Sequence, residues 1–238
     1  MSIKVWSQQW HRWLGVFLEH TCPLCQRSTA ETICPDCQRQ LHHCQLLPAE
    51  QITQDQPNSL TILAWGGYQG HLKRAIAALK YDNHPELAAP LGHWLAQVWL
   101  AHHTTNKPKL TVVPIPLHTD KKQIRGFNQA ELLAEYFCDL TGLPLHRHGL
   151  VRTRSTEAQF QLSASDRAQN LTDAFSLGSG WSKRPPTGAV LLLDDIYTTG
   201  ATVRSAAQTL RRQGIRVYGI TALAKARATP SRATQVDH

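Results

Sequence analysis

The feature that most constrains the fold is an alternation of apolar runs with helical patterns from about residue 61 onward. The apolar runs have no polar face, which is typical of strands that are buried on both faces. Strands alternating with helices predict an α/β domain whose mostly parallel sheet is flanked by helices. We expect strands at residues 60–68, 110–117, 189–195 and 216–226, and helices at residues 70–81, 87–103, 128–142 and 202–214.

One of these strands ends in two adjacent acids and a threonine–glycine loop. Residues 190–203 read VLLLDDIYTTGATV, so Asp194 and Asp195 follow the apolar run directly. At the start of a helix, residues 198–202 (Thr198, Thr199, Gly200, Ala201 and Thr202) can offer N–H groups and hydroxyls to a phosphate, and glycine permits a close approach. The carboxylates suit ribose hydroxyls or a hydrated Mg²⁺. A ribose 5-phosphate that carries a pyrophosphate would suit both the threonine–glycine loop and the two carboxylates. The simpler alternative is that the stretch binds nothing and forms a tight turn with two solvated acids.

The second informative feature is a cluster of cysteines near the N-terminus. Five of the six cysteines lie in residues 22–44, and two CxxC pairs can turn four thiolates toward one point. Such a set predicts a structural Zn²⁺ site with no open coordination position, and metal binding would help this short segment to fold. The ligands would be Cys22, Cys25, Cys34 and Cys37. The alternatives are two disulfides, unused thiols or a thioredoxin-like CxxC. Cys44, beside His42 and His43, could be a spare ligand. Cys138 fits a helical core position.

The charge balance favours an anionic partner. The chain of 238 residues has 25 Lys+Arg against 17 Asp+Glu, which gives a net charge of +8. A basic surplus of this size suits nucleic acid, a phosphorylated metabolite or an acidic lipid as a partner. The alternative is a basic surface that binds nothing. The basic residues between Arg204 and Arg227, with Lys121 and Lys122, could track the phosphates of single-stranded DNA while Tyr81 or Phe127 stacks on bases. The alternative is a solvated helix face.

The domain organisation follows from shifts in composition. We expect an amphipathic helix at residues 1–20, a zinc module at 21–45, a polar connector at 46–60, the α/β domain at 61–228 and a frayed tail at 229–238. The face of the first helix could touch a membrane or pack on the protein itself. No apolar run approaches the ~20 residues that span a bilayer, and no signal peptide is present, so we expect a cytoplasmic protein.

Several segments together resemble one family. VLLLDDIYTTGAT looks like the phosphoribosyl-pyrophosphate (PRPP) motif of type I phosphoribosyltransferases, and RGFNQA at residues 125–130 narrows the resemblance to the ComF family, which also includes GntX-type members. The resemblance extends from about residue 20 to residue 227. It implies a type I phosphoribosyltransferase-like fold with an N-terminal four-cysteine zinc module, and a role in natural competence and DNA uptake. The partners it implies are PRPP, single-stranded DNA and competence or DNA-processing proteins.

The resemblance also implies roles for residues of this chain. Asp194 and Asp195 would hold the ribose hydroxyls directly or through Mg²⁺, and residues 198–202 would cradle the 5′-phosphate. The loop at Ile115 and Pro116 matches the pyrophosphate-binding position, and Lys80 would stand near the entrance.

Further residues are placed by the same resemblance. Arg125 would lie on a hood over the site, within reach of the pyrophosphate, and we group it with the two acids as candidate catalytic residues. Gln159, Arg167 and Asn170 match another family segment without a defined role.

Two functions remain open from the sequence. The first is a PRPP-binding protein that acts in DNA uptake or utilisation and binds single-stranded DNA. The second is an active, Mg²⁺-dependent phosphoribosyltransferase with an unidentified acceptor. In many such enzymes an acid ahead of the phosphate loop assists the reaction, whereas Ile196 and Tyr197 follow the acid pair here. A purely structural zinc adaptor would leave the Asp-Asp-Thr-Gly stretch unexplained.

Overall fold

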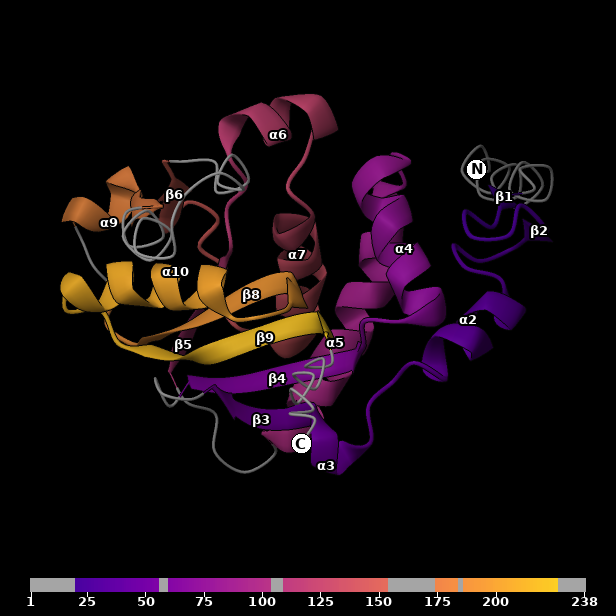
Figure 1. Ribbon diagram of the computed structural model, residues 1–238, viewed down its shortest axis with the longest axis horizontal. Coiled ribbons are helices and arrows are strands. Elements are labelled where there is room, and N and C mark those ends of the chain that lie inside the picture. The colour runs from indigo at the N-terminus through magenta and orange to yellow at the C-terminus, as the bar shows by residue number, and fades with distance from the viewer. Residues whose placement is uncertain (1–19, 56–59, 104–108, 154–173, 184–185, 227–238) are drawn as a thin grey trace, which may run out of the picture.

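The computed structural model describes residues 20–55, 60–103, 109–153, 174–183 and 186–226. Its centre is a five-stranded sheet with the strand order β3-β4-β9-β8-β5 (Figure 1). The strands are β3 (Ile52–Asp55), β4 (Leu60–Gly67), β5 (Leu110–Pro114), β8 (Ala189–Tyr197) and β9 (Val217–Lys225). All neighbouring pairs are parallel except β3 and β4, which are antiparallel, so the predicted mostly parallel α/β sheet is confirmed.

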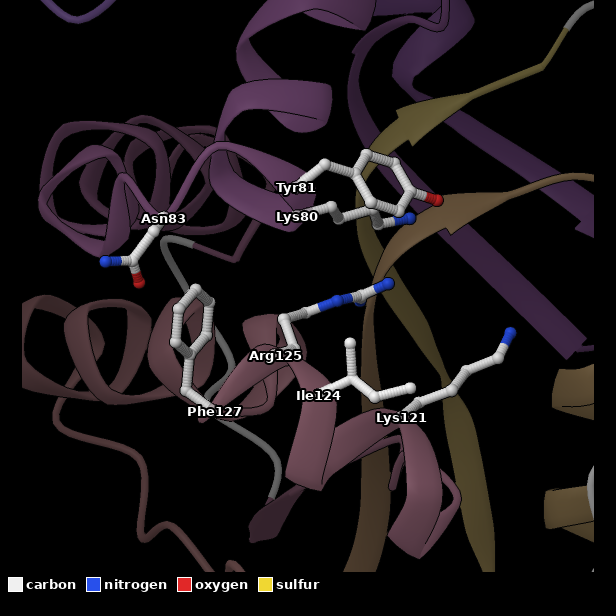
Figure 2. A pocket seen from close by; sticks show the side chains of 7 residues that line it. All are labelled: Lys80, Tyr81, Asn83, Lys121, Ile124, Arg125 and Phe127. Atoms are coloured by element: carbon white, nitrogen blue, oxygen red, sulfur yellow. The ribbon is translucent and has the colours of Figure 1, made fainter.

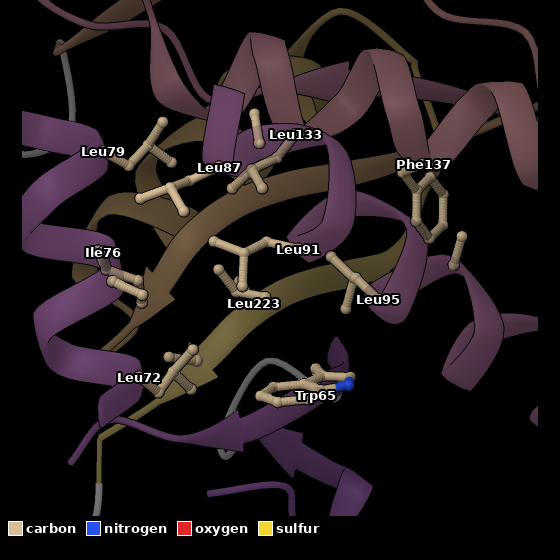
Figure 3. Packing of buried hydrophobic residues seen from close by; sticks show 14 of the residues in the cluster. Trp65, Leu72, Ile76, Leu79, Leu87, Leu91, Leu95, Leu133, Phe137 and Leu223 are labelled. Atoms are coloured by element: carbon tan, nitrogen blue, oxygen red, sulfur yellow. The ribbon is translucent and has the colours of Figure 1, made fainter. Parts of the chain in front are cut away.

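Helices cover both faces of this sheet. On one face, α4 (Gly70–Tyr81), α5 (Ala88–His102) and α7 (Gln129–Thr141) enclose a core with strand residues such as Leu191, Leu193 and Leu223 (Figure 3). On the other face, α10 (Ala201–Arg212) packs on Val190, Leu192 and Ile220 (Figure 1). Because consecutive strand residues point to opposite faces, the unbroken apolar run of β8 supplies both cores.

Smaller elements surround the sheet. The N-terminal part contains β1 (His20–Thr21), β2 (Ser28–Thr29), α2 (Pro35–His42) and α3 (Pro48–Gln51). Beyond the carboxyl end of β5 lies α6 (Thr119–Arg125), and η1 (Pro85–Leu87) precedes α5. A separate pair of antiparallel strands, β6 (Leu150–Arg152) and β7 (Phe175–Leu177), is followed by α9 (Ser179–Lys183).

The expected helices and strands match the structure closely, and one clear difference lies in the segment at residues 46–60. That segment contains α3 and the edge strand β3, which pairs with β4 from Ile52 opposite Leu63 to Asp55 opposite Leu60. The polar composition of β3 reflects its place at the edge, where one side of the strand has no neighbour. The exact division of the chain into domains stays a prediction. Within the described ranges, no helix is long and apolar enough to cross a membrane.

Candidate functional site

The candidate site lies where two neighbouring strands end and the chain turns to opposite faces of the sheet. After β5 the chain continues through α6 into α7 on one face, whereas after β8 it turns into α10 on the other. Ligands of open parallel sheets bind in the crevice that such a reversal leaves at the carboxyl ends of the strands. The fold therefore brings the loop at residues 115–118 and the loop at residues 198–200 to the same edge.

The two adjacent acids interact directly near the end of β8. We expected the strand to end at Asp195, but it continues to Tyr197 because Ile196 and Tyr197 pair with Ala224 and Lys225 of β9. The side chains of the two acids hydrogen-bond to each other, and Lys80 of α4 acts on both of them. The Asp195 backbone N–H donates to Asp194 Oδ1 at 2.9 Å, which holds this carboxyl against the next peptide.

Asp195 is buried and paired with a lysine from another element. Its side chain is 5% exposed and forms an ion pair with Lys80 Nζ from the last turn of α4. Asp194 is partly exposed, and its carboxyl pKa is raised well above the usual value, first by burial and then by the charge of Asp195. The Lys80 ammonium acts in the opposite direction on Asp194. One cation from a distant part of the sequence thus influences both acids.

The threonine–glycine loop leads directly into α10. Thr198 and Thr199 are exposed, and Gly200 precedes the first residue of the helix with φ of +76°. A Cβ at Gly200 would lie 2.3 Å from Tyr197 Oη and 2.6 Å from Arg204 Nη1, so both the backbone conformation and the space require glycine. The exposed loop and the start of a 12-residue helix can offer N–H groups to an anion.

A buried carboxylate that the sequence analysis missed supports this loop. Arg204 Nη1, in the first turns of α10, contacts Asp55 Oδ1 at 3.0 Å and Oδ2 at 3.2 Å. Burial and then Asp55 raise the pKa of Tyr197 to about 12. Asp55 stands at the end of β3, in the stretch expected to be a connector, and the adjacent β-branched residues Ile52 and Thr53 are the signal that could have identified the strand.

The loop after β5 is fixed by hydrogen bonds to its neighbours. The Ile115 N–H donates to Leu193 O at 2.8 Å, and Ile115 O accepts from Asn128 Nδ2 at 3.1 Å. Ile115 is buried and Pro116 is partly buried. Asn128 also caps α7, since its side chain accepts from the Ala130 N–H. This loop is therefore tied to both β8 and the start of α7.

A pocket of about 400 Å³ opens between the ends of α4 and α6 (Figure 2). Five residues singled out from the sequence line it together, namely Lys80, Tyr81, Lys121, Arg125 and Phe127. The Arg125 guanidinium lies 5.2 Å from the centre of the Tyr81 ring. The sequence analysis missed the remaining lining residues, Asn83 and Ile124. No pattern singled them out, because their place in the pocket depends on how the tertiary fold positions the ends of α4 and α6.

Some residues of interest fall outside the described ranges. These are Gln159, Arg167 and Asn170, the tail at residues 229–238, and residues 1–19 of the helix expected at residues 1–20, whose last residue, His20, belongs to β1.

The four cysteines of the CxxC pairs come together as expected. Their Sγ atoms lie within 4.8 Å of one another, and Cys25 Sγ is 3.6 Å from Cys34 Sγ. A tetrahedral zinc with Zn–S bonds of about 2.3 Å places its sulfurs about 3.8 Å apart, so this set fits zinc. The six cysteines are free thiols in this structure. The residues that would hold the ion are Cys22, Cys25, Cys34 and Cys37.

The cysteine-containing segment shares a core with α4. Cys22, Cys37 and Leu41 belong to the same buried cluster as Leu72 and Leu79 of α4. Arg74 Nη2 of α4 also donates to Leu24 O at 3.1 Å. The metal centre therefore packs against the helix that carries Lys80 to the acid pair.

The other two cysteines have different surroundings. Cys44 is buried, and its thiol contacts Gln40 O at 3.7 Å and Gln69 O at 3.6 Å rather than joining the group of four. His42 lies against the Trp94 ring at 4.6 Å. Cys138 is buried in α7, as expected for a core residue, and burial raises its pKa to about 12.

The basic run that follows the loop does not form one continuous surface. Arg204 is engaged by Asp55, and Lys225 Nζ donates to Thr53 Oγ1 at 2.8 Å, with burial lowering the lysine pKa. Arg211, Arg212 and Arg216 are exposed near the far end of α10. A second pocket of about 370 Å³ on that helix is lined by Leu60, Arg204, Ala207, Gln208 and Arg211.

The described side chains do not form a magnesium site. Mg²⁺ requires near-octahedral oxygen ligands. Asp195 is paired with Lys80, the Asp194 carboxyl hydrogen-bonds to that of Asp195, and no described residue that lines the pocket carries a carboxylate. Within the described part of the chain, the four cysteines are the only group close enough to hold a metal.

Comparison with known proteins gives several relatives that match most of the chain, whereas no family model matches. DNA utilization protein YhgH of Salmonella typhi is 32% identical over 198 residues, covering 81% of this chain and 85% of the relative. Competence protein F of Haemophilus influenzae is 32% identical over 163 residues, with coverage of 68% and 71%. Competence protein ComFC of Bacillus subtilis is 26% identical over 203 residues, with coverage of 82% and 73%.

Proposed function

Because the chain belongs to the ComF family of competence and DNA-utilisation proteins, we propose that it binds PRPP at the carboxyl edge of β8 and acts in DNA uptake or utilisation. The observation that carries the proposal is the loop at residues 198–200, where Gly200 is required by both conformation and space at the start of α10. An exposed loop of this kind suits the 5′-phosphate. Asp194 and Asp195 would then meet the ribose hydroxyls.

The pocket beside the acids suits the pyrophosphate group. Among the described residues, its lining includes the cations Lys80, Lys121 and Arg125 and no carboxylate side chain. Ile115 and Pro116 follow the neighbouring strand β5 at the same edge. Positioning and neutralisation of the leaving group are what transfer of a phosphoribosyl group would require. Transfer to an acceptor stays a prediction, and release of pyrophosphate with a panel of nucleobases would test it.

The test of PRPP binding is calorimetric titration of the zinc-loaded protein, with magnesium present. We expect binding at about micromolar affinity, lost in the double variant Asp194→Asn/Asp195→Asn. Glu135→Gln is a suitable control, because Glu135 pairs with Arg147 on the surface of α7 and its replacement removes a negative charge away from the site. No heat of binding with folded wild-type protein would reject the proposal.

A second candidate function is binding of single-stranded DNA, supported by the groove on α10. Its lining includes Arg204, Arg211 and Gln208, and Tyr81 in the other pocket is 74% exposed and available for stacking. Arginines that contact phosphates make affinity fall steeply as salt rises. Fluorescence anisotropy with a labelled oligothymidine should give tighter binding than with duplex DNA, and Arg211→Gln should reduce both the affinity and its salt dependence. Equal weak binding to both forms of DNA and to heparin would contradict a specific site.

A further inference from the structure

The four cysteines that would hold zinc differ in their exposure to solvent. Cys22, Cys34 and Cys37 are buried, whereas Cys25 is partly exposed. Four thiolates around one Zn²⁺ leave two uncompensated negative charges, and negative charge in a poorly solvated site is costly unless cations or hydrogen-bond donors offset it. Cys25 is also the ligand that reagents in solution can reach most easily. The groups around Cys25 therefore matter most for how firmly the centre holds its metal.

Arg27 contacts Cys25 through two different donors. Its backbone N–H and its guanidinium both hydrogen-bond to the Cys25 sulfur. The backbone of Arg27 is fixed at the same time, because its carbonyl oxygen accepts from the Cys22 N–H at 2.9 Å. A hydrogen bond from an ionised donor is roughly twice as strong as one between neutral groups. Arg27 is thus tied to both cysteines of the first CxxC pair.

The backbone between Cys25 and Arg27 adopts an unusual conformation. Within the described ranges, Gln26 is one of two residues other than glycine with a positive φ, here +63°. Its N–H donates to Cys22 O at 2.8 Å, which closes the turn. A residue with a Cβ is unfavourable in this left-handed region, and such strain persists only where the surrounding contacts impose it. The turn at Gln26 accordingly directs the next N–H, that of Arg27, toward the Cys25 sulfur.

The guanidinium of Arg27 is oriented by an acid from the second CxxC segment. Arg27 Nη1 donates to Asp36 Oδ2 at 2.8 Å, and Asp36 lies in the first turn of α2. The Arg27 side chain is 60% exposed, so this ion pair by itself adds little stability. It does restrict a long side chain that would otherwise move away from the sulfur. Arg39 pairs with the same carboxylate from the other side.

We propose that Arg27 is a positioning residue of the zinc centre: it donates to the exposed ligand Cys25, offsets part of the negative charge of the four thiolates and so slows the loss of zinc. Hydrogen bonds from residues outside the ligand set orient the ligands, and their removal typically weakens metal binding by about 10–100-fold. This inference concerns the metal centre alone, so it does not depend on the binding of PRPP or DNA.

The experiment is competition for zinc between the full chain and a chromogenic chelator, with the rate of zinc transfer followed in a stopped-flow spectrometer. We expect Arg27→Gln to weaken zinc binding about tenfold to a hundredfold and to release zinc faster. Arg27→Lys should lie between Arg27→Gln and wild-type protein, because an ammonium keeps the charge but lacks the planar fork that reaches two partners.

Arg39→Gln is the matched control. It removes the same charge from the same carboxylate, and in the described part of the chain Arg39 is not among the donors to Cys25. Its zinc affinity should equal that of wild-type protein. Equal losses in Arg27→Gln and Arg39→Gln would mean that net charge alone decides the affinity, and an unchanged affinity in Arg27→Gln would likewise reject the role of Arg27. Failure of the folded wild-type protein to bind zinc would also overturn it.

A second measurement separates a contact with Cys25 from a general role of Arg27 in folding. Zinc-loaded proteins are treated with iodoacetamide, from which a thiolate displaces iodide, and the modified cysteines are identified by peptide mass spectrometry. A thiolate that loses hydrogen-bond donors is a stronger nucleophile. We therefore expect faster modification of Cys25 in Arg27→Gln and, to a smaller extent, in Arg27→Lys, with the three buried cysteines reacting as slowly as in wild-type protein. Faster modification of all four alike would show that Arg27 only supports folding.

Discussion

Two ion pairs attach helices to the central sheet, one on each face, and they differ in what surrounds them. On the α4 face, Lys80 contacts Asp195 beside a pocket of about 400 Å³ that carries further cations. On the α10 face, one nitrogen of Arg204 contacts both oxygens of Asp55, with Tyr197 beside them. The first pair has room and charge for a ligand to enter, whereas the second supports the backbone of the phosphate loop. Similar ion pairs can therefore support ligand binding on one face of the sheet and the geometry of a loop on the other.

The largest expected effect comes from removing zinc, which should destabilise the α4 face of the sheet and leave the α10 face largely unchanged. Zinc binding contributes on the order of 10 kcal/mol to the folding of small zinc modules. Because the cysteine segment shares its core with α4, removal of zinc should increase amide hydrogen exchange in α2 and α4 and weaken pyrophosphate binding. Exchange in α10 should change little, and adding zinc should restore α4. Equal loss of protection from amide hydrogen exchange in α4 and α10 would contradict the prediction that zinc supports mainly the α4 face.

The next largest effect concerns the phosphate loop on the α10 face. Gly200→Ala should lower the free energy of unfolding by about 3 kcal/mol, because a positive φ costs about 1–2 kcal/mol and the new Cβ would also collide with Tyr197 and Arg204. Gly214→Ala is the control, since Gly214 has φ of +72° with nothing within 4 Å of its Cβ position. Urea denaturation would measure both variants. Equal losses would show that the contacts around Gly200 do not matter.

A smaller effect is expected when the Asp55–Arg204 pair is broken. Asp55→Asn should reduce the free energy of unfolding by about 2 kcal/mol, because the partly buried Arg204 loses its charged partner. Pyrophosphate binding on the α4 face should be retained. Glu135→Gln breaks a surface pair with Arg147 and should change stability by less than about 0.5 kcal/mol. If Asp55→Asn abolished pyrophosphate binding without unfolding the protein, the two faces would not be independent.

The smallest effect is a pH dependence at Asp194. Its pKa is raised in the folded protein, first by burial, so ionisation costs stability: the cost is full above that pKa and declines as the pH falls from it toward the ordinary carboxyl pKa of the unfolded chain. Asp194→Asn should therefore stabilise the protein by about 1 kcal/mol near pH 8, and the gain should shrink toward about pH 5. Denaturation curves of both proteins across this range would measure it. A gain that grows as the pH falls would contradict the raised pKa.

The elements of the fold follow largely from local sequence. The helix expected at residues 70–81 is α4 (Gly70–Tyr81), because Leu72, Ile76 and Leu79 recur at helical spacing. The four cysteines come together because two CxxC turns each direct a pair of thiols to one point. The edge strand β3 escaped prediction, since a short polar strand with one free edge has no clear periodicity.

The sequence by itself determined which chemistry the chain can offer: a metal-binding cysteine set, a phosphate-type loop and a pair of acids after a buried strand. Only the tertiary structure decided how these groups are used. It continued β8 past the acids, and it brought Lys80 to Asp195 and Arg204 to Asp55. The physical reason is that periodicity and propensity act between neighbours in sequence, whereas ion pairs between distant elements depend on how those elements pack.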